Sequence, residues 1–158
     1  MKTTLVAVGK TNDAWIKQGI SVYMDRLKHY LKFEYHELED VKIKSGKPDF
    51  ARVSASEGEK VLKFIEPGDH VVLFDENGKE FSSEGFADWF VKRQNASPRQ
   101  LIFLIGGAYG FSPEVRSRAN EVISLSQMTF SHQMVRVFAI EQIYRAQSII
   151  KGEPYHHR

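Results

Sequence analysis

Short apolar runs alternate with longer amphipathic stretches along most of the chain. The runs at 3–8, 70–74 and 101–105 are almost wholly apolar, which is typical of buried strands. Segment 33–38 alternates apolar and polar residues, as a half-exposed strand does, and 122–125 predicts one further short strand. Strands that alternate with helices favour an α/β fold with a mostly parallel sheet and helices on both of its faces.

Five stretches between and after these runs predict helices. The first is capped by Asn12 or Asp13 and runs to about Tyr30, with apolar residues near helical spacing. The others are a helix from Ser54 or Ser56 through Ile65, one capped by Ser82, a short one opened by Ser112-Pro113-Glu114, and a long final one over His132–Ile150 capped by Thr129 or Ser131. Between elements, Val41–Pro48 predicts a flexible loop and Glu76–Lys79 a tight turn.

The strongest strand pattern runs directly into Gly106-Gly107-Ala108-Tyr109-Gly110. Ligands of parallel sheets bind in the loops beyond the carboxyl ends of the strands, where this glycine loop is expected. Its glycines let the backbone turn sharply and approach a ligand closely. The loop lacks the Lys-Ser/Thr of a phosphate-binding P-loop, and its spacing differs from the dinucleotide fingerprint. On its own it indicates either a ligand site or only a tight strand-to-helix turn.

Length and composition limit the possible classes of protein. The 158 residues suit a single domain, 1–158, and 42% hydrophobic with 27% charged residues is typical of a globular chain. The absence of cysteine excludes disulfides, thiolate metal sites and cysteine nucleophiles. The apolar run near Met1 is too short for a signal peptide or a membrane span, so we expect a soluble, cytoplasmic protein without a membrane partner. We also expect that its chemistry needs no metal.

Charge is distributed unevenly along the chain although the net charge is only +2. Residues 2–32 carry six basic and two acidic side chains, and residues 92–118 carry five basic and one acidic, so each segment has net charge +4. Residues 34–90, with seven basic and fourteen acidic side chains, carry −7. If the two basic segments meet in space they form a surface suited to RNA; otherwise they are an ordinary solvated surface.

Three features near the C-terminus remain ambiguous when each is considered alone. The final helix is apolar around much of its circumference, which favours either a second copy of the chain as its partner or a central position in a monomer. Glu141 and Arg145 have the i, i+4 spacing of a helix ion pair. The tail, Pro154–Arg158, offers tyrosine, histidine and arginine for catalysis, or is a frayed terminus.

Taken together, these segments resemble one family. The sequences Ala-Val-Gly-Lys at 7–10, Leu-Ile-Gly-Gly-Ala-Tyr-Gly at 104–110, Gln-Met-Thr-Phe-Ser-His-Gln-Met-Val-Arg at 127–136, Glu-Gln-Ile-Tyr-Arg-Ala at 141–146 and Pro-Tyr-His at 154–156 occur in this order. The chain resembles the RlmH (YbeA-like) family of SPOUT-class methyltransferases, which methylate N3 of a pseudouridine in large-subunit (23S) ribosomal RNA. The resemblance covers the whole chain.

The resemblance implies a SPOUT-type α/β knot with a C-terminal trefoil knot, a homodimer formed by the final helix, and S-adenosyl-L-methionine as methyl donor. It implies action on the ribosome, on assembled subunits. By position, the cofactor contacts implied by the resemblance are Phe74, Gly106, Leu125, Ser126, Gln127, Met128, Thr129 and Phe130. The polar groups expected near the target base are His132, Arg136, Arg145, Tyr155 and His156. Arg136 and Arg145 are expected to anchor or stabilise an anion, and His156 is the candidate proton acceptor.

The chain departs from the family pattern at two places. The family usually has proline where Ser131 stands, and its tail usually has a basic residue directly after Tyr-His, where this chain interposes His157 before Arg158. These departures put the start of the final helix and the role of the last basic residue in doubt. Two other functions remain: a non-catalytic RNA-binding module, which need not bind a cofactor, and a Rossmann- or flavodoxin-like enzyme, which the glycine spacing disfavours.

Overall fold

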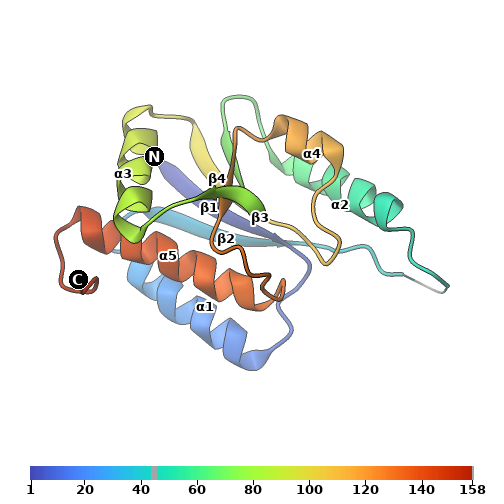
Figure 1. Cartoon of the computed structure of the whole chain (residues 1–158), viewed down its shortest axis with the longest axis horizontal. Coiled ribbons are helices and arrows are strands. Elements are labelled where there is room, and N and C mark those ends of the chain that lie inside the picture. Colours follow the sequence, from blue (N-terminus) through green and yellow to red (C-terminus); the bar gives the residue numbers. More distant parts are fainter. Residues whose placement is uncertain (44–45, 158) are drawn as a thin grey trace.

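The computed structural model describes residues 1–43 and 46–157, which form one twisted sheet between two layers of helices (Figure 1). The strands are β1 (Lys2–Val8), β2 (Lys32–Leu38), β3 (His70–Glu80), β4 (Gln100–Ile105) and β5 (Glu121–Ser124). Their order is β2-β1-β4-β3-β5, and each neighbouring pair is parallel. The predicted parallel α/β sheet is confirmed, and its carboxyl ends lie along one edge.

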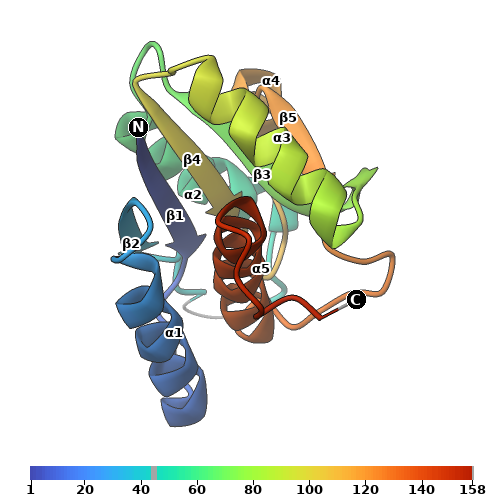
Figure 2. The same ribbon diagram turned by 90° about the vertical axis from the view of Figure 1, so that its left-hand side faces the viewer.

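The helices divide between the two faces of the sheet. They are α1 (Ala14–Leu27), α2 (Phe50–Phe64), α3 (Ser83–Asn95), α4 (Pro113–Arg118) and α5 (Met134–Ile150). Figure 2 shows α1, α3 and α5 on one face, with α2 and α4 on the other. Among the described residues, no helix is both long and apolar enough to cross a bilayer.

Successive side chains of each strand point to opposite faces of the sheet, so they pack alternately against the two helix layers. In β4, Leu101, Phe103 and Ile105 join the core under α1, α3 and α5. Ile102 and Leu104 join the second core, with Val61 of α2 and Val115 of α4. Both sets are buried because parallel strands at the centre of a sheet are covered on both faces. The central position of β4 therefore explains why residues 101–105 are all apolar.

Two predicted caps are confirmed, and one predicted helix start is wrong. The Ser82 hydroxyl accepts from the Gly85 amide and the Ser112 hydroxyl from the Val115 amide. However, α2 begins at Phe50 and is capped by Asp49, so Ser54 lies inside the helix with Ser56, and the helix ends at Phe64. The Asp49 carboxylate accepts from the Arg52 amide, the bond that a serine cap would otherwise make.

The predicted turn at 76–79 is a bulge within β3 instead of a hairpin turn. Phe74 and Lys79 both pair with Ile123, so residues 75–78 project from the strand before it resumes its pairing with β5. A Cβ at Gly78 would lie 2.6 Å from the Ile123 carbonyl carbon, so the two backbones approach too closely for a side chain. The bulge places Asp75 and Glu76 beyond the carboxyl edge of the sheet.

After β5, at the edge of the sheet, residues 125–133 lead to α5 on the face that α1 and α3 cover. The helix before β5, α4, lies on the other face. This connection passes beside Glu76, whose carboxylate accepts a hydrogen bond from Thr129, and beside the glycine loop. It then enters α5, which packs against both α1 and α3 (Figure 2). The Ser131 hydroxyl accepts from the Gln133 amide, whereas Thr129 makes no cap and α5 itself starts at Met134. Residues 44 and 45 of the predicted flexible loop lie outside the described residues.

Arg136, in the first turn of α5, ties this connection to the first strand. Its guanidinium is fully buried and donates to the carbonyls of Val8 and Gly9 at 3.0 and 2.8 Å, and to the Thr11 hydroxyl at 2.9 Å. Its Nε donates to the carbonyl of His132. A buried charge is stable only with such partners. We call this set of bonds the Arg136 brace.

Replacing Arg136 with alanine should therefore lower the free energy of unfolding by about 3 kcal/mol, because the buried carbonyls lose their donor. The midpoint of urea denaturation, followed by circular dichroism, measures the change. Arg52→Ala is the matched control: Arg52 is exposed, and its loss should change stability by less than about 0.5 kcal/mol. Equal effects of the two substitutions would contradict the brace.

Candidate cofactor and catalytic site

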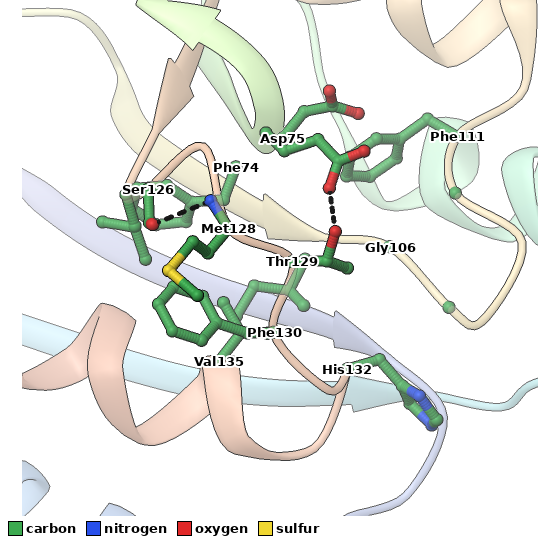
Figure 3. Close-up of a pocket in the computed structure, with 15 residues that line it drawn as sticks. Phe74, Asp75, Gly106, Phe111, Ser126, Met128, Thr129, Phe130, His132 and Val135 are labelled. Carbon is green, nitrogen blue, oxygen red and sulfur yellow. Dashed lines mark hydrogen bonds between the residues drawn. The ribbon is translucent and has the colours of Figure 1, made fainter. Parts of the chain in front are cut away.

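A pocket lies where the ends of β3 and β4 meet the 125–130 connection and the start of α5 (Figure 3). Its walls combine apolar side chains from the strand ends with the glycine loop and polar groups of the connection. The lining residues are Phe74, Asp75, Glu76, Ile105, Gly106, Gly107, Gly110, Phe111, Leu125, Ser126, Met128, Thr129, Phe130, His132 and Val135. The pocket is thus at the carboxyl edge of a parallel sheet, the usual ligand position in such folds.

Every predicted cofactor contact except Gln127 lines this pocket. Gln127 instead lines a neighbouring depression with Glu80 and Phe81. The sequence reasoning missed Asp75, Glu76 and Phe111. Asp75 and Glu76 directly follow a buried strand, which was the available indication that they stand at the ligand edge.

The glycine loop closes on itself beneath the pocket. Gly107 and Gly110 pair as an isolated bridge, and Gly110 has a positive φ of 74°. A Cβ at Gly106 would lie 3.3 Å from the carbonyl carbon of Gly110, so this wall has almost no room for a side chain. The loop therefore presents its backbone to the pocket, as a site that holds a ligand closely requires.

Hydrogen bonds of Ser126 and Thr129 help to hold the connection across the pocket. The Ser126 hydroxyl accepts from the Met128 amide at 2.9 Å, and the Thr129 hydroxyl donates to Glu76 at 2.6 Å (Figure 3). Within the described chain, the amides of Gln127, Thr129 and Phe130 are not used in such bonds. Free backbone amides beside the apolar side chains of Phe74 and Leu125 suit a ligand with a flat apolar body and a polar edge, such as an adenosine.

Two ionisable groups of the pocket have shifted pKa values. Burial tends to raise the pKa of Asp75, but hydrogen bonds from the Asn77 amide and the Arg116 guanidinium outweigh it, so the pKa lies below its usual range. Asp75 is therefore a carboxylate near neutral pH. Burial, together with the charge of Arg136, lowers the pKa of His132, which keeps that imidazole neutral. Arg116 balances the charge of Asp75, so the carboxylate on the β3 side that suits a cationic ligand such as a sulfonium is Glu76.

A separate polar cluster lies further along α5. Arg145 pairs with Glu141, and its Nη1 lies 3.2 Å from Nδ1 of His156. The Tyr155 hydroxyl donates to Glu141 at 2.9 Å, and its ring lies against the Arg145 guanidinium, 4.8 Å from ring centroid to Cζ. Burial, followed by hydrogen bonds with Tyr23 and Glu141, raises the pKa of Tyr155. The tail is thus docked onto the helix, and we call this set the tail cluster.

The structure places the predicted catalytic residues in three different environments. His132 lines the cofactor pocket, whereas Arg145, Tyr155 and His156 form the tail cluster. Arg136 belongs to the brace and is 0% exposed, so its guanidinium is not available to a base in this arrangement. Arg145 lies nine positions after Arg136, which is about 13 Å along a helix. Arg158 lies outside the described residues.

Comparison with known proteins agrees with this geometry. A family model described as "Predicted SPOUT methyltransferase" matches residues 1–156. The chain belongs to the SPOUT methyltransferase family. It is 52% identical to the "Ribosomal RNA large subunit methyltransferase H" of Christiangramia forsetii over 158 residues, covering 100% of both chains. Proteins of the same name from Cytophaga hutchinsonii and Parabacteroides distasonis are 51% and 46% identical, with at least 99% of each chain covered.

Membership in the SPOUT family decides between the open alternatives. The chain is a methyltransferase, its methyl donor is S-adenosylmethionine, and its fold is the knotted α/β fold of that family. The strand order β2-β1-β4-β3-β5 also differs from the flavodoxin and Rossmann orders. The Rossmann-like interpretation is excluded.

Ser126→Ala should weaken S-adenosylmethionine binding about fivefold, because the connection loses the bond that shapes it at Met128. Gln127→Ala is the matched control and should retain the affinity within about twofold, since Gln127 lines a neighbouring depression and not the pocket. Isothermal titration calorimetry with the methyl donor measures both. A larger loss for the Gln127 variant would show that the side chains, and not the backbone, of the connection bind the cofactor.

Proposed function

We propose that this methyltransferase acts on large-subunit (23S) ribosomal RNA in the cytoplasm, at N3 of a pseudouridine, with the assembled large subunit as its substrate. The observation that carries the proposal is the full-length match to three proteins named large-subunit methyltransferase H, together with the pocket that the cofactor contacts line. Methylation of N3 requires that the nitrogen lose its proton. The site must therefore hold the base in line with the donor and stabilise negative charge on the ring.

S-adenosylmethionine, when bound, supplies a methyl group already activated by its positive sulfur. The chain's own residues have the remaining tasks of orientation and proton removal. Phe74 and Leu125 exclude water from the pocket, and the carboxylate of Glu76 favours a cationic ligand there. His132, which is neutral and at the pocket wall, is placed to accept a hydrogen bond from the base. Arg145 is the cation that stabilises the developing anion. His156, whose Nδ1 faces Arg145 and whose Nε2 contacts Glu84, accepts the proton on Nδ1 once Arg145 turns from it to the base.

These tasks require the tail cluster to lie against the cofactor pocket, but within one subunit the two are separate. They would be in contact in a homodimer in which the tail of one subunit covers the pocket of the other. The exposed apolar residues beside the pocket support such an interface. Phe138 of α5 packs on Phe130 with ring centroids 5.0 Å apart, yet both remain more than a third exposed, as does Met134. Most of α5 is otherwise buried within the subunit, so the interface needs only this face.

The dimer is tested by analytical ultracentrifugation. The wild-type chain should sediment as a dimer at micromolar concentration, and Phe138→Glu should shift it toward monomer, because a charge in an apolar interface is costly. Val22→Glu, at an exposed apolar residue of α1, is the control and should leave the dimer intact. A wild-type monomer would contradict the proposed interface.

The substrate and the tail are tested together in a methylation assay on large subunits from cells that lack the gene, with mass spectrometry of the RNA. Wild-type enzyme should add one methyl group to a pseudouridine. Deletion of residues 155–158 should abolish the product while leaving the affinity for S-adenosylmethionine within a few-fold, and His157→Ala, at an exposed residue, should retain activity.

Mixing subunits distinguishes a shared site from two independent ones. The tail deletion is combined with a full-length Leu125→Asp variant, whose cofactor pocket is disrupted but whose tail is intact. Each chain alone should be inactive, while the mixture should regain activity, because one pocket and one tail then meet across the dimer. A mixture as inactive as its parts would refute the shared site.

A further inference from the structure

A second cavity adjoins the cofactor pocket, and the two share Gly107 and His132 as a wall. It lies between the end of β1, residues 40–43, α2 and the glycine loop. Its volume is about 510 Å³, within the range of about 300–1,000 Å³ that small-molecule sites occupy. We call it the Glu57 cavity, because Glu57 of α2 lines it and is 6% exposed.

The carboxylate of Glu57 is only half satisfied. Its Oε1 accepts from the Val41 amide at 3.3 Å, but its buried Oε2 has no hydrogen-bond partner among the described residues. A Cβ at Gly107 would lie 2.8 Å from this oxygen, so the glycine leaves the space beside it clear. A buried oxygen without a partner is costly, and this one is arranged to accept from a donor group of a ligand.

Charged and aromatic residues define what that ligand is. The charged and titratable side chains of the cavity are Lys10, Asp40, Lys42, Glu57 and His132. The charges of the two lysines are balanced by those of the two carboxylates, so the cavity does not suit a small inorganic anion. It suits a molecule with a phosphate at one end and an N–H donor at the other. At the rim, Tyr109 stacks on Phe50 with ring centroids 4.5 Å apart, although the two rings are 37% and 57% exposed.

An exposed aromatic pair beside lysines is how proteins hold unstacked RNA bases. The tyrosine comes from the glycine loop, so the same loop that forms the cofactor wall also carries the aromatic ring. We infer that the Glu57 cavity binds a nucleotide of the RNA that flanks the target, stacking its base on Tyr109 while Glu57 accepts from a ring or exocyclic N–H. This inference rests on the proposed RNA substrate and adds a specificity site to it.

The test compares steady-state kinetics of four variants on large subunits from cells that lack the gene. Glu57→Gln places an amide donor where the acceptor stood, and Tyr109→Ala removes the stacking surface. Each should raise KM for the subunits about fivefold or more, with kcat changed less than about twofold. Glu59→Gln, on the exposed side of α2, and Tyr109→Phe, which keeps the ring, should both leave KM within about twofold.

Calorimetry with S-adenosylmethionine separates this inference from the proposed function. All four variants should keep their affinity for the cofactor within about twofold and their thermal midpoint near that of the wild type. If Glu57→Gln and Tyr109→Ala weaken the cofactor instead and leave KM for subunits unchanged, the cavity belongs to the cofactor site and the inference is wrong. It is also wrong if neither variant changes KM. If the wild type itself methylates no large-subunit RNA, the proposed function fails first.

Discussion

The buried guanidinium of Arg136 is the interaction on which the site depends. It binds the carbonyls at the end of β1 to the first turn of α5, and Gln133 adds bonds to the Lys10 carbonyl and the Asn12 amide. Together these contacts fix the start of α5 against the residues that follow β1. The connection at 125–130 has no regular secondary structure of its own. Its position follows from β5 at one end and the Arg136 brace at the other.

This arrangement separates the pocket from the tail cluster within a subunit. The pocket is formed by strand ends, a glycine loop and the connection, all of which depend on the sheet. The tail cluster depends on the second half of α5 and on contacts with α1 and α3, including the Tyr23–Tyr155 and Glu84–His156 bonds. A rigid helix thus holds the two sets at a constant spacing. In the homodimer that we propose, a twofold axis would bring each tail to the other subunit's pocket in one fixed geometry.

Much of the fold follows from local patterns in the sequence, whereas the roles of several residues do not. The strands, the glycine loop and the Ser82 and Ser112 caps were predictable because apolar periodicity and capping are local properties. The start of α2 was missed because the serines inside it resemble caps as much as Asp49 does. Arg136 was expected at the target base, since an arginine near a motif suggests an anion. Only the packing of α5 on β1 shows that its partners are backbone carbonyls. The knot came from family resemblance and could not have come from periodicity.

The hydrogen bond between Thr129 and Glu76 has a consequence for turnover. It is an exposed bond, and such a bond contributes only about 1 kcal/mol. The rest of the connection, with Met128 77% exposed, has few other ties to the body of the protein. Residues 127–130 can therefore open by local unfolding while the Arg136 brace stays closed. Such an opening would uncover the pocket, so that spent cofactor would be exchanged for a fresh molecule without any unthreading of the chain.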